Sequence, residues 1–161
     1  MHDGFIDHQP VITVREGSPA DFDRYFDEGF ADLSAESRHF RFFTAVRELP
    51  PALRQHLRNV DGQRNAAVIA FDRAVTLPDH PDGKPIGVAR WMSGEEGLPE
   101  LSITVIDAYQ GMGVGVRLMD ALLGLALERG VTQIVLDVLR ENTGMRHLVN
   151  RYRATVVRSG D

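Results

Sequence analysis

Residues 100–130 read ELSITVIDAYQGMGVGVRLMDALLGLALERG, and this stretch decides the fold of the chain. Apolar and polar residues alternate at its start, which predicts a strand over residues 100–106. From about Val114 the apolar residues recur at helical spacing, which predicts a helix that ends at the C′ glycine Gly130. Between the two lies Gln110–Gly115, whose glycines would let an anion approach the free N–H groups at the start of the helix. The stretch therefore predicts a phosphate cradle.

The spacing of the glycines distinguishes between kinds of phosphate site. Gly111, Gly113 and Gly115 give G-x-G-x-G, with Val116 where the dinucleotide fingerprint G-x-G-x-x-G has its third glycine. The Gly-Lys-Ser/Thr of a Walker loop is absent from the sequence. Gln110, Gly113 and Gly115 do match Gln/Arg-x-x-Gly-x-Gly/Ala, so the segment resembles the acetyl-CoA signature of the GNAT superfamily of N-acetyltransferases. The alternative is a strand-to-helix turn that needs small residues and binds nothing.

Length and composition exclude several classes of protein. At 161 residues, 43% hydrophobic and 25% charged, the chain is typical of a soluble globule, and we expect a single domain over residues 1–161. It has no apolar run of the ~18 residues that a membrane span needs and no signal peptide, so we expect no membrane partner. The absence of cysteine excludes thiolate zinc sites and a cysteine nucleophile and fits a cytoplasmic protein. The net charge of −5 argues against a nucleic-acid partner and is compatible with a cationic amine.

The N-terminal part predicts a loose lead-in over residues 1–10, a strand over residues 11–14 and three helices. Ser18 and Pro19 mark the start of the first helix, because serine is a preferred N-cap and proline is favoured at the first helical position. A third helix is expected to begin at Pro50. None of the histidines has recognisable metal or triad spacing, so no metal site is predicted.

The second helix is expected over residues 36–43, after the N-cap Ser34. We expect Phe40 and Phe43 to point inward, because aromatic residues at this spacing belong far more often to a core than to a ligand site. Arg38 and Arg41 should then remain in solvent.

The central part predicts an antiparallel meander. Residues 66–71 and 86–92 read as strands, a loop rich in proline joins them, and a further turn leads into the strand over residues 100–106. Residues 134–139 read as a strand reached through the helix that follows the glycine turn, so this strand should run parallel to residues 100–106. This order weakens the Rossmann alternative, in which the glycine loop follows the first strand of an alternating β-α pattern.

The order of elements is that of the GNAT fold, an α/β (α+β) fold with a mixed, mostly antiparallel sheet. In GNAT proteins the two parallel central strands splay apart, and the pantetheine arm of acetyl-CoA bonds to the backbone between them. Asn142 follows the second of these strands and matches an asparagine that family members often place beside the cofactor; the alternative is a plain N-cap. The resemblance implies the following cofactor-binding residues: Ile103, Val105, Gln110, Gly111, Met112, Gly113, Val114, Gly115 and Asn142.

The resemblance extends from residue 11 to residue 157. Residues 33–43, the leucine-rich helix after them and the strand over residues 66–71 look like the acetyltransferase domain of bacterial Pat-type protein-lysine acetyltransferases. In that group the domain stands alone or is fused to regulatory or acyl-CoA-synthetase-like domains, and we expect no fused domain here.

Two residues are candidates for the catalytic groups. Glu100 stands ten residues before Gln110, where Pat-like enzymes carry their catalytic glutamate, and it would take a proton from the attacking amine. The proton donor to the departing thiolate is less well defined, because many family members use a tyrosine at the position of Val149. Tyr152 lies on the same face of the predicted helix and is our candidate; the alternative is packed aromatic surface. Arg153 also stands where the family usually has glycine.

Together these features predict an acetyl-CoA-dependent N-acetyltransferase that moves the acetyl group directly to a primary amine, such as a small molecule or a protein lysine. The alternatives are a catalytically idle CoA-binding sensor or interaction module, and a nucleotide-binding domain. GNAT domains usually close with a hairpin, yet residues 154–157 supply one strand only. We expect a homodimer through the exposed edge of this strand; the alternative is a sheet that is one strand short and frayed.

Overall fold

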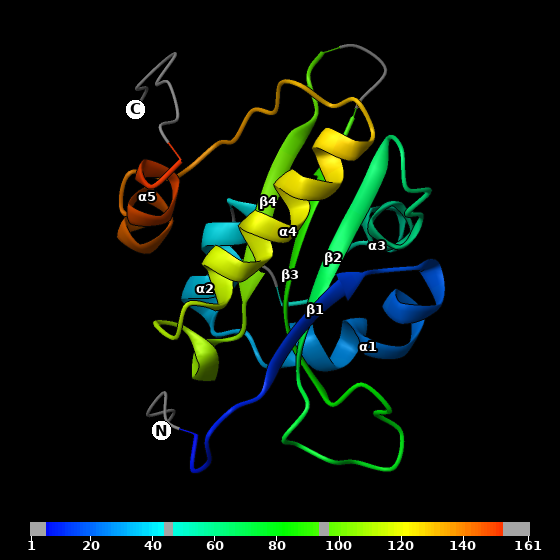
Figure 1. Cartoon of the computed structure of the whole chain (residues 1–161), viewed down its shortest axis with the longest axis vertical. Helices are drawn as coiled ribbons and strands as arrows, with labels where there is room; N and C mark the ends of the chain where they lie inside the picture. Colours follow the sequence, from blue (N-terminus) through cyan, green and yellow to red (C-terminus); the bar gives the residue numbers. More distant parts are fainter. Residues whose placement is uncertain (1–5, 44–46, 94–96, 153–161) are drawn as a thin grey trace.

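The computed structural model describes residues 6–43, 47–93 and 97–152 (Figure 1). Its strands are β1 (Ile12–Glu16), β2 (Asn65–Asp72), β3 (Lys84–Met92) and β4 (Glu100–Val105). Its α-helices are α1 (Pro19–Ala31), α2 (Ala35–Phe42), α3 (Pro51–Arg58), α4 (Val114–Glu128) and α5 (Thr143–Asn150), and a 3₁₀ turn, η1, spans Asp107–Tyr109. None of the described helices is long and apolar enough to cross a membrane. The predicted strand over residues 154–157, on which the expected dimer depends, lies outside the described residues.

The four strands form one antiparallel sheet in the order β1-β2-β3-β4, which confirms the predicted meander. The predicted parallel strand over residues 134–139 is wrong. This segment contacts the sheet through a single parallel bridge, in which the Leu101 amide donates to the Val135 carbonyl over 2.8 Å and the Val135 amide donates to the Pro99 carbonyl over 2.9 Å. Beyond Val135 the described part of the segment forms no further backbone pairing with β4. Parallel pairing in the described sheet is therefore limited to one bridge.

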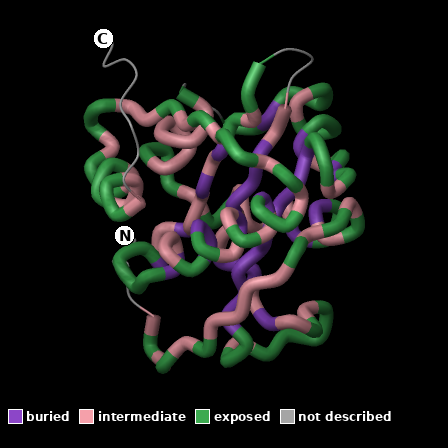
Figure 2. Tube along the Cα trace, turned by 45° about the horizontal axis from the view of Figure 1, so that its top comes forward, coloured by how far each residue is buried: buried purple, intermediate pink, exposed green. Residues whose placement is uncertain are grey.

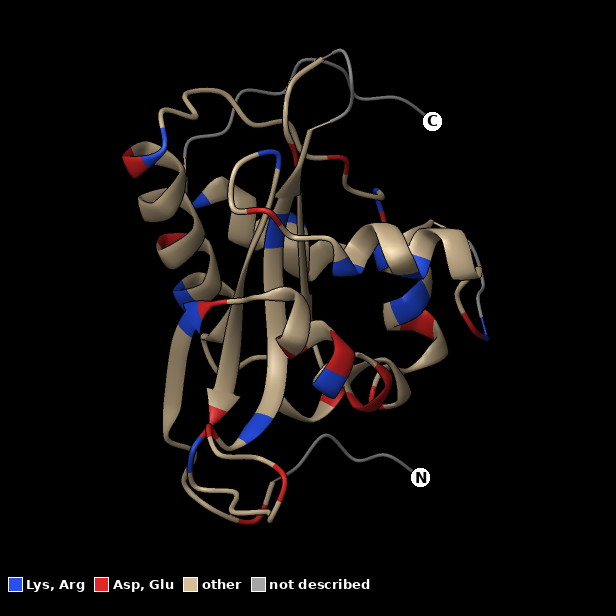
Figure 3. Ribbon diagram, turned by 90° about the vertical axis from the view of Figure 1, so that its right-hand side faces the viewer, with Lys and Arg blue, Asp and Glu red and all other residues tan. Residues whose placement is uncertain are grey.

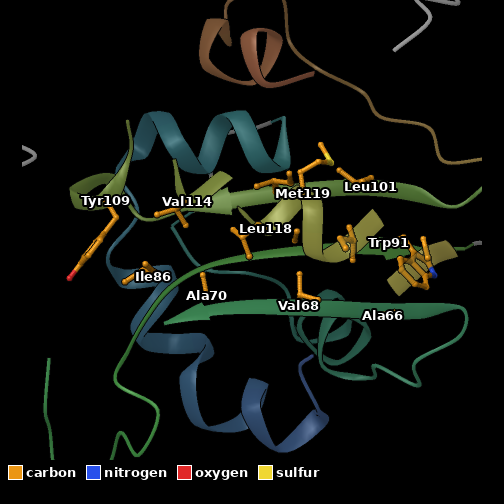
Figure 4. Close-up of a cluster of buried hydrophobic side chains, with 14 of the residues drawn as sticks. Ala66, Val68, Ala70, Ile86, Trp91, Leu101, Tyr109, Val114, Leu118 and Met119 are labelled. Atoms are coloured by element: carbon orange, nitrogen blue, oxygen red, sulfur yellow. The ribbon is translucent and has the colours of Figure 1, made fainter. Parts of the chain in front are cut away.

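The sheet separates two apolar clusters because successive side chains of β2 point to opposite faces. Ala66, Val68 and Ala70 face α4 and pack with its Leu118 and with Trp91 of β3 (Figure 4). The intervening residues of β2 face the helices before the sheet, where α1 adds two aromatic rings; this second cluster comprises Phe22, Tyr25, Val60, Ala67, Ile69 and Phe71. All eight residues of β2 are buried, and Figure 2 shows buried positions concentrated in the sheet between the two helical layers. Both faces of the sheet are therefore covered.

Local capping explains where the main helices begin and end. The Ser18 hydroxyl accepts a hydrogen bond from the Asp21 amide, and the Asp21 carboxylate accepts one from the Ser18 amide, a capping box that confirms the predicted start of α1. Gly130 has a φ of 76° beyond the end of α4, and the Val131 amide donates back to Ala126. This arrangement is a Schellman motif and confirms Gly130 as the C′ residue.

The predicted orientation of α2 is wrong for three side chains. Arg38, expected in solvent, is partly buried and donates to the Phe30 carbonyl over 2.8 Å. Phe43 is 44% exposed and caps the helix with a left-handed φ of 61°, so its side chain leaves the helical register. Arg41 is half-buried rather than in solvent, and its guanidinium carbon lies 4.7 Å from the centroid of the Phe42 ring. Phe42, which the periodicity did not single out, lines an internal cavity beneath the helix. Figure 3 shows basic and acidic positions interspersed over the helices and loops.

Candidate active site

A cleft of about 980 Å³ lies beside the free edge of β4. It is bounded by β4, by α2, by the loop before α4, and by α5 with the segment leading to it. Figure 1 shows α5 set away from the sheet and joined to α4 by the extended segment over residues 131–139. Its volume is near the upper end of the range for small-molecule sites, about 300–1,000 Å³. The cleft can therefore hold an elongated ligand.

The glycine-rich loop forms one wall of this cleft. Gly111 and Gly113 have φ values of 80° and 83°, and a Cβ added to either would meet no other group within 4 Å, so an approaching ligand finds open space there. Gly113 is the N-cap of α4, and no side chain caps this end of the helix. The first amide that donates to the Gly113 carbonyl is that of Arg117. Among the described residues the amides of residues 111–116 therefore have no acceptor, and they fit the oxygens of a phosphate or pyrophosphate.

A buried carboxylate holds the residue that precedes this loop. The Tyr109 hydroxyl donates to Asp72 over 2.7 Å, and Asp72, at the end of β2, has no solvent exposure. His8 donates to the same carboxylate over 2.6 Å, and the amides of Val11 and Ala74 donate to its other oxygen over 3.0 Å each. Burial alone would raise the pKa of Asp72, but these hydrogen bonds outweigh it and lower the pKa below its ordinary value. Sequence reasoning missed this network, although the acid at the end of an apolar strand was a visible signal.

The predicted splay between strands is present in a reduced form. The Leu101 amide donates to Val135 and the Ile106 amide donates to Ile86 of β3, so by the alternation of an antiparallel pair the amides of Leu101, Ile103 and Val105 point away from β3. Only Leu101 finds a backbone partner, Val135, so the amides of Ile103 and Val105 stay unpaired within the described part of the chain. The Gln110 side-chain amide donates to the Val105 carbonyl over 2.9 Å and to Ser37 over 3.2 Å. Gln110 thus positions the loop, while two amides remain open to the cleft.

Glu100 lies exposed at the rim of the cleft, at the start of β4. Arg41 of α2 also lines the cleft. Burial lowers the pKa of Arg41 to about 10, and the charge of Glu100 opposes this shift; within the described part of the chain the two side chains form no ion pair. A carboxylate and a guanidinium therefore line the same cavity.

Asn142 and Tyr152 occupy different surroundings. Asn142 lines the cleft, and its side-chain oxygen accepts a hydrogen bond from the Met145 amide over 3.1 Å, so it serves as the N-cap of α5. Tyr152 lies outside the set of described residues that line the cleft; its hydroxyl donates to Asp120 over 2.7 Å and contacts the Val116 carbonyl at 3.3 Å. Burial, then the hydrogen bond to Asp120, raises the pKa of Tyr152 to about 12.

The structure brings most of the predicted cofactor residues into one cavity. Ile103, Val105, Gln110, Gly111, Gly113, Val114, Gly115 and Asn142 line the cleft. Met112 is the exception and is 38% exposed on the outside of the loop. Among the described residues no group of three or more His, Asp or Glu side chains could hold a metal ion.

Comparison with known proteins assigns the chain to a family. The sequence profile described as "Acetyltransferase (GNAT) family" matches residues 28–153. The chain is similar to Acetyltransferase PA5475 of Pseudomonas aeruginosa, at 34% identity over 119 residues that make up 72% of this chain and 60% of that protein. It is also similar to Acetyltransferase Pat of Mycolicibacterium smegmatis, at 33% identity over 149 residues that make up 90% of this chain and 41% of that protein. The chain thus spans less than two thirds of the length of either relative.

Solved structures agree on the fold. The GNAT domain of S. lividans PAT superposes with a TM-score of 0.76 at 24% identity, over 92% of this chain and 84% of that one. The cAMP-binding acyltransferase from Mycobacterium smegmatis gives a TM-score of 0.59 at 27% identity, over 93% of this chain and 44% of that one. The acetyltransferase yncA from Salmonella typhimurium, solved with its cofactor acetyl-CoA, gives 0.68 at 17% identity, over 91% of this chain and 81% of that one. With a family profile that covers most of its length, this chain belongs to the GNAT family of acetyltransferases.

Proposed function

We propose that this domain transfers the acetyl group of acetyl-CoA directly to a primary amine bound in the cleft. The observation that carries the proposal is the set of unpaired amides along one cavity: those of residues 111–116 at the start of α4, and those of Ile103 and Val105 on the edge of β4. The first set would hold the pyrophosphate, and the second would hold the pantetheine arm and polarise the acetyl carbonyl. Asn142, on the facing wall, would border the same arm.

The chemistry also needs an uncharged amine. A lysine-type ammonium with a pKa near 10.4 is deprotonated in only about one molecule in a thousand at neutral pH. Glu100 would take the proton, directly or through one water, as the amine nitrogen attacks the thioester carbonyl. The C–N bond forms, the C–S bond breaks and CoA leaves as a thiolate. The 161 residues contain no cysteine, so a cysteine acyl-enzyme has no candidate in this domain.

Tyr152 remains our predicted donor of a proton to the thiolate. In the structure its hydroxyl donates to Asp120, and the role requires that hydrogen bond to break. Its raised pKa of about 12 also makes the hydroxyl a weaker acid than a typical thiol, whose pKa is about 8.5. Proton transfer from Tyr152 to the thiolate would therefore run uphill. Release from Asp120 would make it less so but still uphill, because an unperturbed tyrosine pKa of about 10 still exceeds that of the thiol.

The test of the proposed function is the rate profile of Glu100→Gln. We expect this variant to bind acetyl-CoA as the wild type does and to lose about 10²–10⁴ in kcat at neutral pH. The loss should shrink as the pH rises, because the amine then deprotonates without a base. Glu128→Gln, an exposed position near the end of α4 outside the cleft, removes the same charge and serves as the control. Equal activity of Glu100→Gln and wild type at pH 7 across small amines and lysine peptides would refute the role of Glu100.

A further inference from the structure

A second cavity, of about 100 Å³, lies on the face of the sheet that α1, α2 and α3 cover. Its walls are aromatic rings from α1 and α2, aliphatic side chains, the guanidinium groups of Arg41 and Arg90, and the carboxylate of Asp21, which Arg15 binds. Arg41, Phe42 and Thr104 line both this cavity and the larger cleft, so the two spaces share a wall and meet at α2. We call the smaller space the inner chamber.

Strand register relates the inner chamber to Glu100. Arg90 of β3 pairs with Ser102 of β4, and Met92 pairs with Glu100. Alternate residues of a strand share a face, so Arg90 and Glu100 lie on the same face of the sheet as diagonal neighbours, roughly 7 Å apart at the backbone. The carboxylate is exposed at the rim, whereas Arg90 is 3% exposed. A ligand in the inner chamber would thus meet a cation at depth and a carboxylate at the entrance.

Among the described residues neither arginine forms an ion pair, although the charge of Glu100 acts on Arg41 from a greater distance. Arg90 donates to the Leu57 carbonyl over 2.7 Å and stacks on Phe22 with its guanidinium carbon 4.6 Å from the ring centroid, and neither contact neutralises its charge. Arg41 contacts the Phe42 ring and likewise has no carboxylate within ion-pair distance in the described part of the chain. Burial, and then the charge of Arg41, lowers the pKa of Arg90 to about 9. Burying two like charges is costly unless an anion pairs with them.

We propose that the acceptor is an aliphatic α-amino acid whose carboxylate binds Arg41 and Arg90 while its amine faces Glu100. Guanidinium groups suit a carboxylate because their N–H donors match its two oxygens. The aromatic walls would take the side chain, and a chamber of about 100 Å³ is smaller than the ~150 Å³ cavity that holds benzene, which favours a branched aliphatic group over a ring. Transfer would join the acetyl carbon to the α-nitrogen and release CoA thiol and an N-acetyl amino acid. The proposal rests on the proposed function and names its acceptor.

Binding without turnover tests the proposal separately from the proposed function. Leucine and leucinamide, which lacks the carboxylate, are titrated by calorimetry into the protein saturated with CoA, which has no acetyl group to transfer. We expect leucine to bind at least about ten-fold more tightly than leucinamide. The preference should disappear in Arg41→Met, whose half-buried position tolerates change. It should persist in Arg24→Met, which removes the same charge from an exposed site on α1 outside both cavities.

Three outcomes would overturn the proposal. Equal affinity for leucine and leucinamide would show that the arginines do not bind a carboxylate of the acceptor. Tighter binding of succinyl-CoA than acetyl-CoA, lost in Arg41→Met, would assign the arginines to a carboxylate on the acyl donor instead. An unchanged leucine preference in both Arg41→Met and Arg90→Lys would also refute it; the second variant keeps the charge while losing the planar fork. A failure of CoA itself to bind would instead count against the proposed function.

Discussion

Replacing Gly113 by aspartate or by asparagine would isolate the charge of the ligand that the glycine-rich loop binds. Gly113 has a φ of 83°, and a Cβ there meets no other group within 4 Å. Asparagine and aspartate tolerate this left-handed conformation better than most residues with a Cβ. The two variants therefore have nearly the same shape and backbone strain, and they differ by one negative charge at the N-cap of α4.

The size of the effect follows from electrostatics. Two unit charges 4 Å apart interact by about 1 kcal/mol in water and about 4 kcal/mol at an effective dielectric constant of 20. A pyrophosphate on the amides of residues 111–116 would lie close to such a side chain, so Gly113→Asp should bind CoA between about five-fold and several hundred-fold more weakly than Gly113→Asn. The helix dipole acts in the opposite direction on folding, because a carboxylate at the N-cap stabilises the helix by about 0.3–1 kcal/mol. The weaker binder should therefore be at least as stable.

Calorimetric titration with CoA at low and high salt, with thermal melts of both variants, measures these quantities. The difference in affinity should shrink in high salt, because the loop is exposed and its charges are screened. Equal CoA affinity for the two folded variants would refute the phosphate cradle. Lower stability of Gly113→Asp would refute the helix-dipole reasoning and leave the affinity comparison confounded by folding.

Two further predictions concern the Tyr152 hydroxyl and the buried Asp72 carboxylate. Tyr152→Phe should lower kcat without changing CoA affinity if the hydroxyl is the acid; unchanged kcat with a stability loss of about 1 kcal/mol would assign it to the hydrogen bond with Asp120 alone. Asp72→Asn should cost about 2–4 kcal/mol of unfolding free energy at pH 7, because it removes a buried charge that His8, Tyr109 and two amides bind. Since the pKa of Asp72 is lowered in the folded state, its contribution is present above about pH 4 and is lost as the pH falls through the folded-state value. Urea unfolding at about pH 7 and below about pH 3 should show the gap between wild type and Asp72→Asn narrowing at the lower pH, and a gap independent of pH would contradict this.

The elements that the sequence predicts well are those with local signals. The capping box at Ser18, the Schellman glycine Gly130 and the alternating residues of β4 each determine structure within a few residues. Such local signals do not predict how the segment over residues 134–139 pairs with its neighbours. Its apolar residues do give an extended chain, and Ile134 and Leu136 pack against the core. Side-chain periodicity reports burial of one face, however, and carries no information on whether a neighbouring strand is there to pair with.

The features that sequence reasoning missed depend on contacts between distant parts of the chain. Asp72 gathers partners from the N-terminal lead-in and from the turn before the glycine loop, and no local pattern predicts this meeting. Arg90 gave a clearer signal, since a cation within the apolar run of β3 must either reach solvent or be buried. Helical periodicity through Phe43 predicts a solvent position for Arg41, but the left-handed backbone of Phe43 ends the helix one residue earlier.

Release of CoA thiol from acetyl-CoA in the presence of a panel of amines, with mass spectrometry of the amines, tests most directly whether the cleft transfers an acetyl group. The panel should include leucine, leucinamide, a polyamine and a lysine peptide. We predict that thiol and one N-acetylated amine form in equal amounts and only when the protein is present. Binding of acetyl-CoA with no thiol release across the whole panel would contradict the proposed function and indicate a CoA-binding sensor. Calorimetric binding of ATP with none of acetyl-CoA would contradict it as well and indicate a nucleotide site.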